Sequence, residues 1–173
     1  MKSLRIVFYI LIVAFTFSCS SEKDKEIKMS RANWDTGYFH AEIYKTGLQL
    51  LGYKIDKLND VKPSVFYVAA ASGDVDLWTN GWETNQKTYI DEAKGKVIPV
   101  GYVANKEFLE NNPRARKFLE IASIPVADIS TQNFLMYKGE KSQKDIERHA
   151  QNWIKENQTK FDGWINEAIK LTK

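Results

Sequence analysis

Aromatic side chains are the residues of this sequence whose types and spacing best suggest chemistry. Trp34, Tyr38, Trp78 and Trp82 gather at or just after the ends of segments that are predicted to be strands. Open α/β sheets bind ligands where strand ends face loops. Aromatic faces attract cations, and cages of such rings recognise quaternary ammonium ions. Core packing is the alternative for each ring, and it is least convincing for Trp82, which stands in a polar loop containing glycine.

Catalytic and metal-binding patterns are scarce by comparison. His40 and His149 are far apart in the sequence, and neither has neighbours with the spacing of metal ligands. A nucleophile elbow, a phosphate-binding glycine loop and a cysteine–histidine pair are all missing from the sequence. Asp74 and Asp76 are one residue apart and could do acid–base work, but their place after Gly73 favours a turn. The sequence therefore predicts a binding protein without cofactor or metal, and not an enzyme.

The N-terminal segment has the features of a targeting sequence. Residues 1–18 begin with two basic side chains and continue into an apolar run of 12 residues. As a helix this run would rise about 18 Å, which is short of the ~30 Å hydrocarbon core of a bilayer. A signal peptide is the better interpretation. Cys19 ends the run after the small residue Ser18 and resembles the lipidated cysteine of bacterial lipoproteins, while secretion with a spare thiol is the alternative. Residues 19–28 are polar and suit a tether.

Composition limits the remaining classes. The chain has 173 residues, a formal net charge of +3 and one cysteine. Its length fits a single domain, residues 29–173, with a sizeable core. The charge gives no reason to expect a nucleic-acid partner. A single cysteine excludes an internal disulfide framework and a cysteine-based metal site. The leader predicts an extracytoplasmic, or periplasmic, protein that is anchored to the membrane through Cys19.

The elements that must position the aromatic residues alternate between strands and helices. We expect a strand at 27–33, a helix at 35–51, a strand at 53–55, a helix from Pro63 that ends at Gly73, and a strand at 75–78. Later segments are a strand at 97–104 and helices that begin at 112, 129, 142 and 161. Trp153 and Trp164 recur at the spacing of a buried helical face. This order predicts an α/β fold with a mostly parallel sheet flanked by helices.

Several motifs resemble the first lobe of glycine betaine/proline betaine-binding proteins, which are the extracytoplasmic substrate-binding components of ABC importers. The N-terminal motifs are ASGDVDLW at 71–78 and GW at 81–82. The C-terminal motifs, in the order of that family, are VANK at 103–106, NP at 112–113, PVADI at 125–129, QN at 132–133, KGE at 138–140, DI at 145–146, WI at 153–154 and FDGW at 161–164. The resemblance spans residues 27–173.

This resemblance implies a shortened form of a two-lobed fold, the type II periplasmic-binding-protein fold. Members of the family hold the ligand in a cleft between two α/β lobes that crossing strands connect, and this chain is long enough for one lobe. The two matching halves meet near 94–99, where the family inserts its second lobe. Trp82 matches a tryptophan of the family's cage, and Gln86 falls where some members have a ligand-contacting histidine. Trp34 and Tyr38 could line the same strand ends, without a family role.

Two functions follow as hypotheses. The first is a single-lobe substrate-binding component that works with the permease of an ABC importer for quaternary ammonium solutes such as glycine betaine. One lobe would leave half of the cation solvated, so binding by a monomer should be weak. The alternative is a lipid-anchored interaction or regulatory protein that docks on the importer and binds no small ligand. An enzyme, such as a small hydrolase, is the third and least supported interpretation.

Overall fold

A five-stranded sheet forms the centre of the protein. The computed structural model describes residues 26–81, 83–99 and 102–171. The strands are β1 (Met29–Ala32), β2 (Asn59–Val61), β3 (Leu77–Trp78), β4 (Val97–Pro99) and β5 (Val103–Asn105), in the order β2-β1-β3-β5-β4. β1 is parallel to both β2 and β3, whereas β5 is antiparallel to β3 and to β4. Four strands therefore point the same way, and the predicted α/β fold with a mostly parallel sheet is confirmed.

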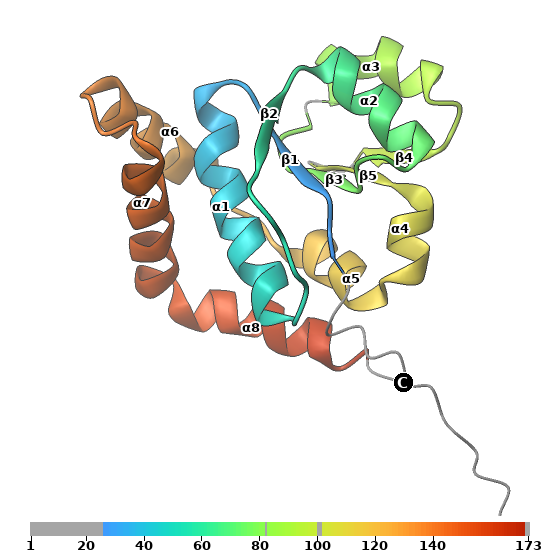
Figure 1. The fold of residues 1–173 in the computed structure, drawn as a ribbon. Helices are drawn as coiled ribbons and strands as arrows, with labels where there is room; N and C mark the ends of the chain where they lie inside the picture. The colour runs from blue at the N-terminus through green and yellow to red at the C-terminus, as the bar shows by residue number, and fades with distance from the viewer. Residues whose placement is uncertain (1–25, 82, 100–101, 172–173) are drawn as a thin grey trace, which may run out of the picture.

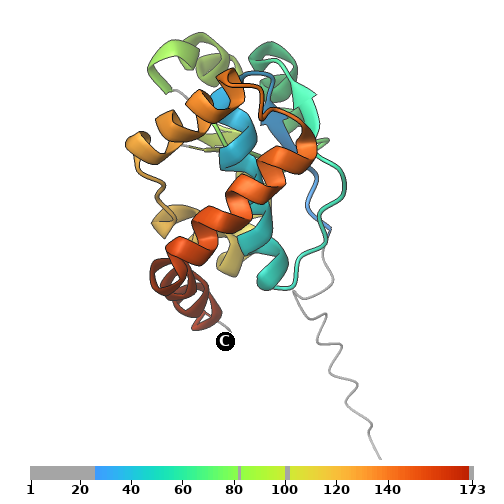
Figure 2. The same ribbon diagram turned by 90° about the vertical axis from the view of Figure 1, so that its left-hand side faces the viewer.

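Helices cover both faces of this sheet (Figure 1). They are α1 (Asp35–Leu50), α2 (Pro63–Ser72), α3 (Glu83–Glu92), α4 (Lys106–Asn111), α5 (Pro113–Ile121), α6 (Val126–Tyr137), α7 (Gln143–Glu156) and α8 (Gln158–Ile169). Neighbouring residues of a strand point to opposite faces, so Leu77 enters the core under α1, α5 and α8 while Trp78 enters the smaller core under α2 and α3. Figure 2 shows α7 lying in front of α1, with α6 beside them.

The larger core is organised around aromatic rings of the C-terminal helices. Trp153 and Trp164 stack with ring centroids 6.1 Å apart, and both are less than a tenth exposed. Phe118 meets Trp164 edge-on at 6.4 Å. α1 passes close to Phe118 at Gly47, where a Cβ atom would lie 2.1 Å from the phenylalanine ring. The expectation that these two tryptophans pack the C-terminal helices onto the body is confirmed.

Two predicted strands differ from those observed. Residues 53–55 do not form the second strand, since Lys54 makes only an isolated bridge to Glu26 and β2 begins at Asn59. The alternation of apolar residues there indicates buried side chains and not a paired strand, because Tyr53 and Ile55 enter the core from a loop. The strand predicted at 97–104 is two strands, β4 and β5, which pair with each other. An apolar run indicates burial, but it does not show where the chain reverses.

The N-terminal part of the described chain packs against the body. Ile27 is 1% exposed, and its backbone N–H donates to the carbonyl of Lys54 at 2.8 Å. The backbone N–H of Lys28 donates to Asp76. The end of the range expected as a tether, 19–28, is therefore in contact with the fold. The predicted signal peptide and Cys19 lie outside the described residues. No helix in the described part of the chain is both long and apolar enough to cross a membrane.

Candidate functional site

The carboxyl ends of β1 and β3 bring two connections of the chain together. Trp34 follows β1, and its ring meets the ring of Trp78 edge-on at 5.4 Å. Asn80 follows β3, and its side-chain amide donates a 2.7 Å hydrogen bond to the hydroxyl of Thr36 at the start of α1. Since the two strands are parallel, both connections lie at one edge of the sheet. This is the edge at which open α/β sheets bind ligands.

Glycine allows the connection after β3 to pass close to β5. A Cβ atom on Gly81 would lie 2.6 Å from Cγ2 of Val103 and 3.2 Å from the carbonyl carbon of Tyr102. Real Cβ atoms do not approach so closely, so a larger residue would push this connection away from β5. Trp82, the candidate cage residue, comes next in the chain and lies outside the described residues. Its role in ligand contact stays a prediction.

Trp34 lies at the rim of this edge, whereas Trp78 lies in the core beneath it. Trp78 is fully buried and stacks on Phe66 with ring centroids 5.0 Å apart. Trp34 is half-buried, with its ring packed against the Trp78 side of the core. Trp34 is therefore partly accessible to solvent at the carboxyl edge. Ligand contact by Trp34 stays a prediction.

Tyr38 lies in a different environment from Trp34. The guanidinium carbon of Arg31 stands 4.4 Å from the centre of the Tyr38 ring, and Arg31 also pairs with Asp60 at 2.6 Å. The Tyr38 hydroxyl is 3.5 Å from the Asp60 carboxylate. Burial and the negative charge of Asp60 raise the pKa of Tyr38. The protein thus supplies its own cation to this ring, on the β2 side of the sheet, which weakens the case for Tyr38 as a ligand contact.

Gln86 is turned into the protein. Its side chain is buried, and its amide oxygen accepts a 2.7 Å hydrogen bond from the hydroxyl of Tyr67 on α2. Tyr67 in turn packs on Trp78 and stacks on Tyr89. In the sequence, Gln86 stands out only because the resemblance aligns it with a ligand-contacting histidine of some family members. The spacing of Gln86, Tyr89 and Ala93 is a signal for a helical face packed inward.

β4 and β5 form a hairpin at the same edge. Pro99 pairs with Val103, and Val97 pairs with Asn105 at the far end of the two strands. β4 points in the direction of β3, so the chain reverses at the carboxyl edge, beside the Gly81 connection. Residues 100–101, within this reversal, lie outside the described residues. The hairpin occupies the region where the two halves of the family resemblance meet.

The remaining polar candidates have structural surroundings. His40 is partly buried, and desolvation of its ring lowers its pKa to about 4. His149 contacts Glu140 at 2.9 Å. Asp74 accepts from the hydroxyl of Ser72, and Asp76 accepts from the backbone of Lys28. Burial raises the pKa of Asp76. Among the described residues, no group of histidine, cysteine and carboxylate side chains is arranged to hold a metal ion.

Comparison with known proteins identifies relatives that bind glycine betaine. The model of the OpuAC family, described as the substrate binding domain of ABC-type glycine betaine transport systems, matches residues 25–99 and 85–156. The glycine betaine-binding periplasmic protein OusX of Dickeya dadantii (strain 3937) is 53% identical over 71 residues, which are 41% of this chain and 21% of that protein. The glycine betaine/proline betaine-binding periplasmic protein of Escherichia coli (strain K12) is 49% identical over 94 residues, which are 53% of this chain and 28% of that protein.

A solved structure supports the fold. The crystal structure of lactococcal OpuAC, in its closed-liganded conformation with glycine betaine, superposes with a TM-score of 0.70 at 13% identity and covers 82% of this chain and 100% of that chain. The aligned segments span less than a third of the length of the two curated relatives. The family model covers more than half of this chain, and its members are binding components and not enzymes. The chain belongs to the OpuAC family of substrate-binding domains of ABC-type glycine betaine transport systems.

Proposed function

We propose that this protein is a single-lobe, extracytoplasmic substrate-binding component of an ABC importer for quaternary ammonium solutes of the glycine betaine and proline betaine type. One observation carries the proposal. The family model matches in two segments that overlap at 85–99, and β4, which ends at Pro99, pairs directly with β5. The resemblance to two-lobed members of the family implies that their second lobe enters the chain at this point. A short hairpin here is what the removal of that lobe would leave.

The chemistry of the proposal rests on the carboxyl edge. Trp34 is held at its rim, and Gly81, which precedes Trp82 in the chain, lies at the same edge. The face of an indole attracts a methylated ammonium group, by about 0.5–1 kcal/mol where the contact is exposed to water. A single lobe offers no opposite wall, whereas pockets for small ligands usually enclose about 70–90% of the ligand. A monomer should therefore bind a betaine no tighter than about millimolar, which corresponds to about −4 kcal/mol.

The proposed location and partners follow from the relatives and from the leader. The two curated relatives are periplasmic proteins by name. A lipid on Cys19 would keep the mature protein at the membrane, near the permease that we propose as its partner. Glu26 precedes β1 and bridges Lys54 at the edge opposite to the carboxyl ends of the strands. A tether attached there would leave the carboxyl edge free to face ligand or permease.

Titration of the mature protein tests this function. Tryptophan fluorescence and calorimetry would follow the addition of glycine betaine, proline betaine and choline at several protein concentrations. We expect millimolar binding that Trp82→Ala abolishes. Submicromolar binding by a demonstrated monomer would contradict the single-lobe account. Submicromolar binding that appears only as the protein dimerises, and that Trp82→Ala removes, would mean instead that two chains rebuild the cleft.

A docking protein without a small ligand is the second candidate. Two positions that could have contacted ligand have internal partners: Arg31 covers Tyr38, and Tyr67 binds Gln86. This observation favours a lobe that keeps its fold while losing its ligand. The same titration separates the two functions when it is combined with co-purification of the permease. Permease association without any betaine binding would support the docking protein.

A further inference from the structure

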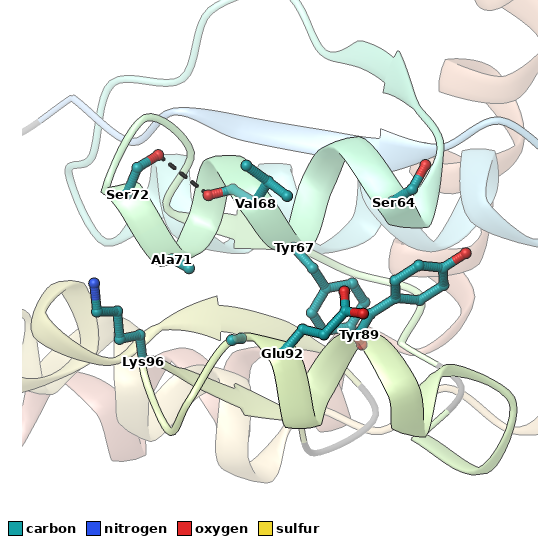
Figure 3. Close-up of a pocket in the computed structure, with 9 residues that line it drawn as sticks. Ser64, Tyr67, Val68, Ala71, Ser72, Tyr89, Glu92 and Lys96 are labelled. Carbon is teal, nitrogen blue, oxygen red and sulfur yellow. Dashed lines mark hydrogen bonds between the residues drawn. The ribbon is translucent and has the colours of Figure 1, made fainter.

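A groove lies between α2 and α3 (Figure 3), and the carboxyl-edge residues Trp34, Asn80 and Gly81 are not among the residues that line it. Its volume of about 350 Å³ is within the range of about 300–1,000 Å³ that is usual for small-molecule sites. α2 contributes one wall and α3 the other, and Lys96, which precedes β4, lies at one end. The residues that line it include Tyr67, Val68, Ala71, Tyr89, Glu92 and Lys96.

The middle of this groove is apolar and aromatic. Tyr67 and Tyr89 stack across it with ring centroids 5.7 Å apart and planes inclined by 21°. Val68 is 70% exposed on the α2 side, although valine is usually buried. The whole of α2, from Pro63 to Ser72, carries no charged side chain. A surface helix of this composition lacks the polar outer face that such helices usually have.

The groove has a negative side chain, Glu92, and a positive side chain, Lys96, at different positions along its length. Glu92 follows Tyr89 by three residues on α3, so the carboxylate and the ring share one face of the helix. In Figure 3 the Lys96 side chain lies at the other end of the groove from Tyr89, near Ala71 and Ser72. Within the described residues, neither Glu92 nor Lys96 has an ion-pair partner. A carboxylate beside an aromatic ring favours an organic cation, and an ammonium group favours an anion.

We propose that the α2–α3 groove binds an elongated zwitterion, with its cationic end at Tyr89 and Glu92, its apolar chain over Val68 and Ala71, and its carboxylate at Lys96. This site is independent of the betaine site at the carboxyl edge and does not need it. The charged side chains are exposed, so the contribution of each to affinity is modest, about two- to fivefold for one exposed charge pair. Binding should be in the millimolar range.

Nuclear magnetic resonance titration of the mature protein tests the site, with γ-butyrobetaine as the zwitterion and butanoate and tetramethylammonium as fragments that carry one charge each. We expect the zwitterion to shift the signals of Tyr89, Ala93 and Ala71 and to bind two- to fivefold more tightly than either fragment. Glu92→Gln should weaken the zwitterion two- to fivefold and leave butanoate unchanged. Lys96→Met should weaken the zwitterion and butanoate alike, and leave tetramethylammonium unchanged.

Matched variants of neighbouring charges serve as controls. Asp91→Asn removes a negative charge next to Glu92, and Lys94→Met removes a positive charge two residues before Lys96. Neither Asp91 nor Lys94 lines the groove. Both variants should bind like the unmodified protein. Zwitterion shifts that survive Glu92→Gln and Lys96→Met unchanged, or that equal those of the controls, would overturn the proposal.

Trp82→Ala separates this site from the proposed betaine site. Groove signals that still respond in Trp82→Ala support the groove, even where betaine binding at the carboxyl edge is lost or was never present. Shifts that vanish in Trp82→Ala and persist in Glu92→Gln would place the zwitterion at the carboxyl edge and refute the groove. A titration without any shift of the groove signals refutes it as well.

Discussion

The hydroxyl of Tyr67 on α2 donates a 2.7 Å hydrogen bond to the amide oxygen of Gln86 on α3, and both side chains are buried. This bond joins the two helices that cover the smaller core. Removal of one partner of a buried hydrogen bond leaves the other partner desolvated, at a cost of about 1–3 kcal/mol. We therefore assign Gln86 a structural role in place of ligand contact.

A double-mutant cycle checks this assignment. Gln86→Leu and Tyr67→Phe should each lower the free energy of unfolding in urea by about 1–3 kcal/mol. The double variant should lose less than the sum of the two, since a bond can be removed only once. Effects that add to within about 0.5 kcal/mol would show that the two side chains do not depend on each other.

Two glycines on helices should respond to alanine in opposite ways. Gly47→Ala places a Cβ atom 2.1 Å from Cζ of Phe118, so overpacking should lower the free energy of unfolding by about 1–3 kcal/mol. A Cβ atom on Gly163 of α8 would meet no neighbouring side chain within 4 Å, so Gly163→Ala should raise it by about 0.5–1 kcal/mol. Urea titration measures both. Equal effects of the two substitutions would contradict the close approach of α1 and α5.

Trp164 should be among the most sensitive residues of the core. Its indole is 7% exposed and contacts the rings of Trp153, Phe118 and Phe161. Trp164→Ala should lower the free energy of unfolding by about 3–5 kcal/mol. Phe134→Ala is the control, because Phe134 is 57% exposed on α6, and its loss should be below about 1 kcal/mol. A similar loss for both variants would be inconsistent with this packing of α8.

His40 should make stability depend on pH. Burial lowers its pKa to about 4 from the ordinary value of 6.5. In the unfolded chain His40 becomes protonated below about pH 6.5. In the folded chain it stays neutral until about pH 4. The free energy of unfolding should therefore decrease as pH falls through this window, by about 1.4 kcal/mol for each pH unit at most.

The test for His40 measures how steeply the free energy of unfolding changes with pH, and not its value at one pH. His40→Leu should have a shallower dependence of unfolding free energy on pH between 6.5 and 4, because its carboxylates are unchanged and only the imidazole is removed. Urea unfolding at several pH values gives both slopes. An unchanged slope would mean that the imidazole is protonated equally in the folded and unfolded chains.

Cys19 should decide where the protein is found. If the cysteine is lipidated, Cys19→Ala should release the protein from membranes, because acyl chains supply the membrane affinity. Metabolic labelling with a fatty acid, followed by membrane fractionation, measures this. Secretion without lipidation, the alternative, predicts no label on the unmodified protein and the same distribution for both forms.

Features that depend on local chemistry can be predicted from the amino-acid sequence alone. Gly73 is predicted to end a helix, and it caps α2 in the left-handed conformation with φ of 84°. The spacing of Ser142 and Asp145 predicts a near capping box, and both hydrogen bonds of that box are present at the start of α7. The helical spacing of Trp153 and Trp164 is enough to place both in the core. Caps and periodicity act within a few residues, so they can be read from the chain.

Contacts between distant elements give two of the candidate side chains partners within the fold. Arg31 reaches the Tyr38 ring, and Tyr67 reaches Gln86, from other elements of the fold. The reversal at Pro99, which splits one apolar run into β4 and β5, depends likewise on pairing with β3 through β5. These contacts join residues that are distant in the sequence or that lie on different elements. Local spacing carries no information on them, because they form only when the strands and helices have packed.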